Sequence, residues 1–371
     1  MNDTSLKIFT AVLFILTLEC SAQLSQPLEM GRYLVGFKVR RISILNPNGL
    51  GDSVELVLNL WYPAEKKSEA EIRLLDYAHL HLSTLPETEY QTAIGKEKQD
   101  VRFFISKNFG TFSETDWKRV EQQRAYATLE APYFSSKFPL ILGRLRAFST
   151  TYTNEYLASH GYIVCMLNGV EDFPPDNRPA YHGQVTREID FYHYVKKFLT
   201  DSLKITNGVS GLMGFSGGGF SQFIAPMNSN SFQAVALLES GIFLDGDLFE
   251  IVSTHPYYDA KEFNTPLLFL YNKNRFEQNI SSERFFDLNI PEKYLILFND
   301  STQHHWDFAT EGTIASLFLN TRGEKVNRRQ VDTFKELNGI VLRFFDQYLK
   351  DLNDLGLMKN KATIIEPKDN P

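Results

Sequence analysis

The chain has 371 residues, 43% of them hydrophobic, so it is long enough to bury a substantial core in one large domain or in two. Charged residues make up 22% and the formal net charge is −7, with acidic and basic side chains interspersed. This mixture has no clustered basic face, which argues against a nucleic-acid partner.

The first twenty-two residues have the pattern of a cleavable signal peptide. Lys7 lies in a short polar lead, and Ile8–Leu18 is an apolar run too short to cross a bilayer as a helix. Cys20 and Ala22 then place small residues three positions and one position before a cleavage site. We therefore predict that residues 1–22 are removed and that the mature protein is secreted or periplasmic. No later stretch reaches the apolar length of a membrane-spanning helix.

The chain has two cysteines, Cys20 and Cys165. Cleavage after residue 22 leaves only Cys165, so no disulfide can form within the mature chain even in an oxidising compartment. Cys165 lies within the apolar run Tyr162–Leu167, which indicates a buried strand residue and not a reactive thiol.

Two early strands are predicted over Leu34–Ile44 and Val54–Tyr62, where apolar and polar residues alternate, and we expect them to be antiparallel. Between residues 65 and 135 no periodicity is sustained, and we interpret this stretch as an irregular insertion before the third strand. It contains His79 and His81, a pair without a third ligand, which favours surface or turn histidines over a metal site. We predict neither a metal nor another cofactor.

From residue 138 onward, short apolar runs alternate with helical patterns. The predicted strands are Phe138–Gly143, Tyr162–Leu167, Val209–Phe215, Ala234–Leu238, Pro266–Tyr271 and Tyr294–Phe298. The predicted helices are Thr151–Ser159, Thr186–Thr200, one that opens at Gly217, and Val331–Leu349. This alternation is typical of a mostly parallel sheet with right-handed crossovers. We therefore predict a single α/β domain over residues 23–355, followed by a polar, mobile tail over residues 356–371.

The segment from Gly214 to Gly218 matches G-x-S-x-G, a weak signal on its own because glycine and serine are common. Here it follows an apolar strand and opens a helix, which is the context that a nucleophile elbow requires. The sharp turn strains the serine backbone and leaves room only for hydrogen at positions 214 and 218. This predicts Ser216 as a nucleophile at the carboxyl edge of the sheet, with the N–H of Gly217 directed at a developing oxyanion.

A serine nucleophile needs a base, and in this chain order the acid and then the histidine should follow it. His304 and His305 come directly after the last predicted strand, where a base loop is expected. His255 falls between strands and is the weaker candidate.

The predicted acid is Glu239. The strand Pro266–Tyr271, whose end is the commonest position for the acid, runs into Asn272 and lacks a carboxylate there. Strand Ala234–Leu238 ends in Glu239, which can orient an imidazole and stabilise its charged form. Asp245 and Asp247 are the alternatives.

Several segments resemble the platelet-activating factor acetylhydrolase group and the related dienelactone-hydrolase-like esterases. They are Leu60–Ala64 (LWYPA), Phe138–Ile141 (FPLI), Leu157–Val164 (LASHGYIV) and the serine elbow. The resemblance extends from about residue 34 to 350, is weakest across the insertion, and implies the α/β-hydrolase fold and ester hydrolysis.

The same resemblance bears on the site residues. The family acid lies in a Leu-Asp-x-x-x-Phe context, matched here by Leu238 to Phe243 with Glu239 in place of Asp. The family histidine precedes x-x-Phe, and this spacing favours His305 over His304. The family loop Ser-His-Gly-Leu-Gly, whose backbone supplies the second oxyanion donor, is two residues shorter here. Leu145 matches the donor position, but the His-Gly pair before it is missing.

The leading hypothesis is a serine hydrolase that cleaves carboxylic esters with short or oxidised acyl chains, phospholipid-type esters included, through an acyl-enzyme intermediate. A peptidase or a polysaccharide-ester deacetylase on the same scaffold is the alternative enzyme. A hydrolase-like binding protein with a decayed oxyanion hole is the alternative of another class. The partner expected is a small-molecule or lipid ester, and the sequence leaves oligomeric state open.

Overall fold

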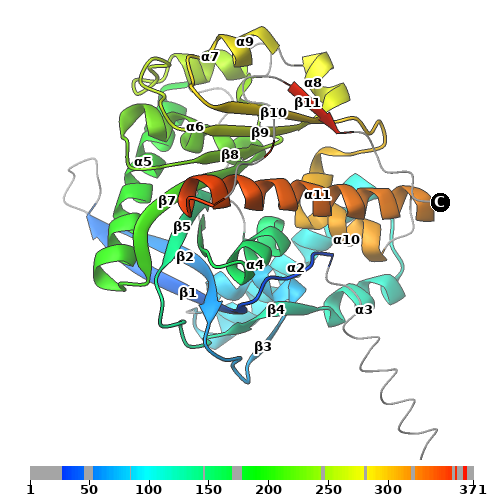
Figure 1. Ribbon diagram of the computed structural model, residues 1–371. Coiled ribbons are helices and arrows are strands. Elements are labelled where there is room, and N and C mark those ends of the chain that lie inside the picture. The colour runs from blue at the N-terminus through cyan, green and yellow to red at the C-terminus, as the bar shows by residue number, and fades with distance from the viewer. Residues whose placement is uncertain are drawn as a thin grey trace, which may run out of the picture.

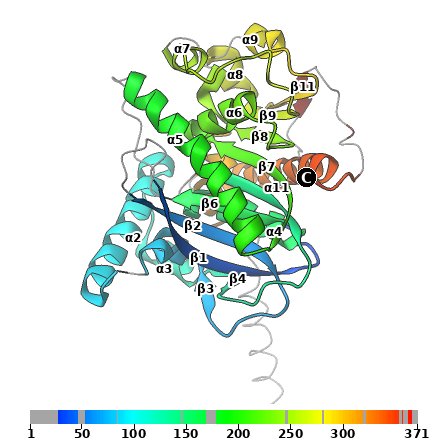
Figure 2. The same cartoon turned by 90° about the vertical axis from the view of Figure 1, so that its left-hand side faces the viewer.

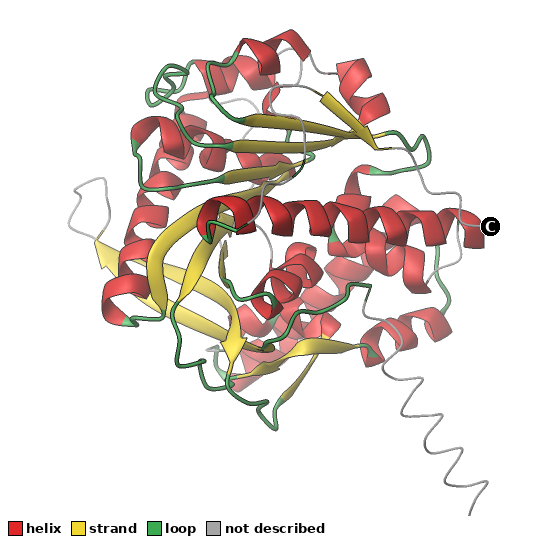
Figure 3. Cartoon of the chain, in the orientation of Figure 1, coloured by secondary structure: helices red, strands yellow, loops and turns green. Residues whose placement is uncertain are grey.

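One sheet of eleven strands runs through the described part of the chain, in the order β11-β10-β9-β8-β7-β5-β6-β2-β1-β4-β3 (Figures 1 and 3). The computed structural model describes residues 27–45, 53–83, 85–144, 147–168, 178–243, 247–279, 282–318, 322–352, 356 and 362–365. The predicted signal peptide, residues 1–22, lies outside them.

The sheet has an antiparallel part and a parallel part. The predicted antiparallel pair is confirmed as β1 (Leu34–Leu45) and β2 (Ser53–Ala64), and β2 also pairs antiparallel with β6 (Ile163–Asn168). The parallel strands that continue from β6 are β5 (Phe138–Arg144), β7 (Thr206–Phe215), β8 (Val235–Leu238), β9 (Leu267–Asn272) and β10 (Lys293–Phe298). The carboxyl ends of these strands therefore meet at one edge, which is where ligands bind in such sheets.

Helices cover both faces of the parallel strands. One face packs against α4 (Thr151–Ser159), α10 (Thr310–Phe318) and α11 (Glu324–Leu349). The other packs against α5 (Arg178–Lys197), α6 (Gly219–Asn228), α7 (Asp247–Ser253) and α9 (Ser282–Asp287), and Figure 2 looks onto α5. Within β5, Ile141 belongs to the first core, whereas Leu140 and Leu142 belong to the second. Burial on both faces explains why these strands appear in the sequence as continuous apolar runs.

The insertion is ordered, which differs from the irregular segment expected over residues 65–135. It contains β3 (Glu71–Arg73), α2 (Glu87–Phe109), α3 (Glu114–Gln122) and β4 (Arg124–Leu129). Strand β4 extends the sheet by pairing with β1, and α3 begins with a capping box between Ser113 and Asp116. The helical period of α2 was not visible because Ile105 and Phe109 are its buried residues and most of the others are polar or charged.

The structure bears on four smaller expectations. The tail contains β11 (Ala362–Ile365), which adds a parallel strand beside β10, so at least this part is ordered. His79 lies in a turn as predicted but is buried, with Nε2 3.4 Å from the Asp76 carboxylate. Cys165 is fully buried in β6, and burial raises the pKa of its thiol. Among the described helices, none has the length and apolar character needed to cross a membrane.

His255 joins the segment after α7 to α5. Its Nδ1 accepts a hydrogen bond from the Tyr257 N–H at 3.1 Å, and its Nε2 lies 3.1 Å from the carbonyl oxygen of His182 and 3.2 Å from Thr186 Oγ1. These contacts fit a neutral ring with its hydrogen on Nε2. Burial lowers the pKa of His255 to about 4. The contacts of this weaker candidate base hold the turn after α7 against α5.

We expect His255 to make the fold sensitive to acid. The unfolded side chain takes up a proton near pH 6.5 and the folded one near pH 4, so the free energy of unfolding falls as the pH drops through that window. The expected loss from this group between pH 7 and 4.5 is about 2 kcal/mol. Denaturant unfolding of the wild type and of His255→Gln at both pH values measures it, and equal pH dependence in the two proteins contradicts the expectation.

Candidate active site

The turn after β7 has the geometry of a nucleophile elbow. Ser216 has a φ of 53°, and a short 3-10 turn over Ser216–Gly218 leads directly into α6. A side chain on Gly214 would bring its Cβ to 2.7 Å from Cα of Gly219, so the glycine is required there. Gly219 is equally crowded, because its Cβ would collide with the hydroxyl of Ser240. The G-x-S-x-G pattern did not indicate this second constraint.

Three side chains from distant segments form one hydrogen-bonded chain at this edge. His305 Nε2 lies 3.0 Å from Ser216 Oγ, and His305 Nδ1 lies 2.9 Å from Glu239 Oε2. Because Nδ1 donates to the carboxylate, Nε2 is left to accept the hydroxyl proton of the serine. The arrangement places a hydroxyl, an imidazole and a carboxylate in the order that acyl transfer by a serine nucleophile uses.

Glu239 directly follows β8, has a φ of 47° and has no exposed side-chain surface. Its Oε1 accepts a hydrogen bond of 2.5 Å from the backbone N–H of Asn272, at the end of the neighbouring strand β9. Its Oε2 accepts from His305 and also lies 3.4 Å from Nε of Arg275. Both carboxylate oxygens therefore have partners, which is what burial of a charge demands.

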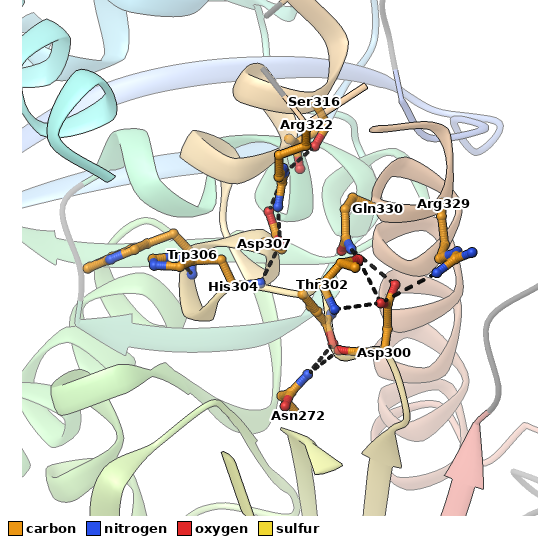
Figure 4. Close-up of polar contacts among 12 residues, drawn as sticks. Asn272, Asp300, Thr302, His304, Trp306, Asp307, Ser316, Arg322, Arg329 and Gln330 are labelled. Carbon is orange, nitrogen blue, oxygen red and sulfur yellow. Dashed lines mark hydrogen bonds and ion pairs between the residues drawn. The ribbon is translucent and has the colours of Figure 1, made fainter. Parts of the chain in front are cut away.

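The base loop, residues 299–308, is tied to β9 and α11 by a polar network (Figure 4). Asn272 Nδ2 donates to the backbone oxygen of Asp300 at 3.0 Å and to Gln303 Oε1 at 3.1 Å. The Asp300 carboxylate accepts from the backbone and hydroxyl of Thr302 and, at 3.0 Å, from Gln330 of α11. The residue in the usual acid position is thus an uncharged anchor for the loop that carries the histidine.

A buried ion pair fixes the other end of the base loop (Figure 4). Asp307 forms two hydrogen bonds with Arg322, at 2.8 and 2.9 Å, and also accepts the backbone N–H of His304 at 2.6 Å. The Nδ1 of His304 faces the backbone N–H of Trp306 at 3.3 Å, and burial lowers the pKa of His304. The structure therefore places His305 against the serine, while His304 caps the turn beside it.

Aromatic side chains hold the imidazole in place and connect it to the insertion. The His305 ring stacks on Phe215 with centroids 4.9 Å apart. From α2, Phe104 packs edge-on against Trp306 at 4.6 Å, and Phe109 against His304 at 5.4 Å. The insertion thus contacts the base loop directly. This contact joins segments far apart in the sequence, so local sequence patterns could not predict it.

Part of the predicted site lies outside the described residues. Gly217 follows the serine in the turn that opens α6, but Leu145, the second predicted oxyanion donor, is among the residues not described, as is Asp245. The residue before Leu145, Arg144, lies 2.6 Å from the Glu188 carboxylate of α5, whose pKa is raised by burial. Asp247 begins α7.

Comparisons with known proteins establish the fold class. No protein-family model matches the chain, and no curated protein sequence matches it. It is similar to a solved ferulic acid esterase from Streptomyces cinnamoneus, with a TM-score of 0.57 and 17% identity over 87% of this chain and 92% of that one. At this identity the similarity supports the α/β-hydrolase fold alone, in agreement with the largely parallel, helix-covered sheet.

Two longer peptidases are similar at lower TM-scores. The acylaminoacyl peptidase of Pyrococcus horikoshii has 14% identity and a TM-score of 0.44, and the AtxE2 isopeptidase has 13% and 0.46. The chain spans 43% and 41% of their lengths. The finer resemblance to platelet-activating factor acetylhydrolases stays a prediction.

The ion pair between Asp307 and Arg322 offers a test of how the base loop is held. We expect Asp307→Asn to lower the free energy of unfolding by about 3 kcal/mol, because it leaves a half-buried guanidinium without its partner. Chemical denaturation measures this change. The double variant Asp307→Asn/Arg322→Met should recover part of the stability. An unchanged free energy of unfolding in Asp307→Asn would show that the ion pair does not hold the base loop.

Proposed function

We propose that the chain is a serine hydrolase that cleaves carboxylic esters, with Ser216 as nucleophile, His305 as base and Glu239 as acid. The observation that carries this proposal is the hydrogen-bonded chain from Ser216 through the two ring nitrogens of His305 to Glu239. The strained backbone of Ser216 at a strand–helix turn supports it independently.

In the proposed reaction, Ser216 Oγ attacks the acyl carbon while His305 Nε2 accepts its proton, and Glu239 stabilises the resulting imidazolium. The N–H of Gly217, with that of Leu145 as the second proposed donor, stabilises the oxyanion of the tetrahedral intermediate. Collapse of this intermediate expels the alcohol, which takes the proton from His305, and leaves an acyl-enzyme. Water then attacks the acyl carbon with His305 again accepting a proton, and the carboxylic acid leaves as Ser216 is re-formed.

The substrate class that we propose is esters with short or oxidised acyl chains, phospholipid-type esters included, based on the resemblance in sequence. The same proposal has the protein act outside the cytoplasm, based on the pattern of residues 1–22. The competing functions are hydrolysis of an amide and ligand binding without turnover.

The nucleophile is tested by Ser216→Ala, which removes the hydroxyl and leaves a side chain that the elbow accommodates. We expect turnover of nitrophenyl esters to fall by about 10⁴-fold or more, with an unchanged melting temperature. A fluorophosphonate probe should label the wild type and not the variant. Labelling of both proteins, or ester hydrolysis that survives the substitution, would remove Ser216 from the mechanism.

The base is tested with a neighbouring histidine as the matched control. His305→Ala should cost nearly as much activity as loss of the nucleophile, because the members of a triad act as a unit, whereas His304→Ala should retain most of it. Glu239→Gln should cost less than His305→Ala but still about 10³-fold or more, since it removes the charge that stabilises the imidazolium. The reverse order for the two histidines would show that the register across the base loop is wrong.

A further inference from the structure

The acid of the proposed triad has a cation beside it. Nε of Arg275 lies 3.4 Å from Oε2 of Glu239, the same oxygen that accepts the hydrogen bond from His305 Nδ1. The Arg275 side chain is 36% exposed, whereas that of Glu239 is fully buried. A guanidinium and an imidazole therefore share one carboxylate oxygen, an interaction that the triad itself does not require.

Local structure fixes Arg275 in this position. It lies in the first turn of α8 (Lys273–Asn279), where its backbone N–H donates to Asn272 Oδ1 at 3.1 Å. Its guanidinium lies over the ring of Tyr271, 5.9 Å from the centroid. Since Asn272 also anchors the base loop, one side chain sets both the helix that carries the arginine and the loop that carries the histidine.

The other titratable groups around Glu239 and His305 are neutral or paired. Burial and the nearby Glu239 charge raise the pKa of Tyr271 of β9 to about 12. Burial lowers the pKa of His304 in the base loop. The Asp307 carboxylate of that loop is held by Arg322. The Asp300 carboxylate of the base loop lies 3.7 Å from Arg329 of α11. Arg275 is thus the charge that lies against the shared oxygen.

We propose that Arg275 is a positioning residue that stabilises the negative charge of the hydrogen-bonded Glu239–His305 pair, and so extends ester hydrolysis to lower pH. The inference rests on the proposed function. In the state that is competent for catalysis, the hydrogen-bonded pair of Glu239 and His305 carries one negative charge, and a proton added to either residue removes that charge. A cation at 3.4 Å stabilises the negative state and repels an imidazolium, so both effects oppose protonation.

The experiment compares the pH dependence of kcat/KM for the wild type, Arg275→Gln, Arg275→Lys and Lys273→Gln. Lys273 is the matched control, because it lies on the same helix, carries the same charge and faces Glu277 at 3.8 Å. The substrate is an uncharged nitrophenyl butyrate, read at the isosbestic wavelength of the released phenol. Melting temperatures are measured over the same pH range.

In Arg275→Gln we expect the acid limb of the profile to move to higher pH by roughly half a unit to one unit, with the alkaline plateau within about threefold of the wild type. Arg275→Lys should restore most of the shift, and Lys273→Gln should leave the limb in place. In 1 M salt the difference between wild type and Arg275→Gln should shrink, because an exposed charge is screened.

Two results overturn the inference. The first is a kcat/KM profile of Arg275→Gln that runs parallel to that of the wild type and is lower by the same factor at every pH, which indicates a packing role only. The second is a shift of the same size in Lys273→Gln. Both leave the proposed function intact as long as Ser216→Ala is inactive. If the wild type neither hydrolyses esters nor reacts with the fluorophosphonate, the proposed function fails and the inference fails with it.

Discussion

A carboxylate with no exposed surface needs a partner for each of its oxygens, and the arrangement around Glu239 follows from that requirement. One oxygen is satisfied by the backbone of the adjacent strand, at Asn272, and the other by the imidazole of His305 and the guanidinium of Arg275. Each of these partners lies on a different segment, so satisfying the buried charge also fixes the segments relative to one another. The imidazole is directed at Ser216 as a result of this arrangement.

The segments that meet at Glu239 are held by separate means. The base loop is tied at one end by Asn272 and Asp300, and at the other by the ion pair of Asp307 with Arg322. The insertion adds aromatic contacts from α2 to the same loop. A loop would otherwise be among the more mobile parts of a domain, and these contacts give it the rigidity that the proposed base needs.

The sequence predicted strands β1, β2 and β5 to β10 and the residues of the elbow, because buried strands and tight turns have local signatures, but it did not predict β3, β4 and β11. A continuous apolar run followed by G-x-S-x-G can be identified without knowing the fold. Chain order indicated Glu239 and left His304 and His305 open, and the resemblance to a known family favoured His305. Arg275 and Asn272 could not, because their roles depend on which strand ends are neighbours. The helices of the insertion were missed for a related reason: α2 buries Ile105 and Phe109 and presents mostly polar residues elsewhere, so its period is hidden.

Residues at the ends of β8 and β9 have two different roles: one supplies the carboxylate, and the other anchors the base loop. The end of β8 supplies the negative charge through Glu239, and the end of β9 supplies a neutral tether through Asn272, whose backbone touches the carboxylate and whose side chain touches the base loop. The imidazole therefore contacts Glu239 directly and is linked to the end of β9 only through Asn272 and the base loop. Placement of the carboxylate and attachment of the loop are therefore separate in this fold, because the proposed acid follows one strand and the loop that carries the histidine is tied to the next.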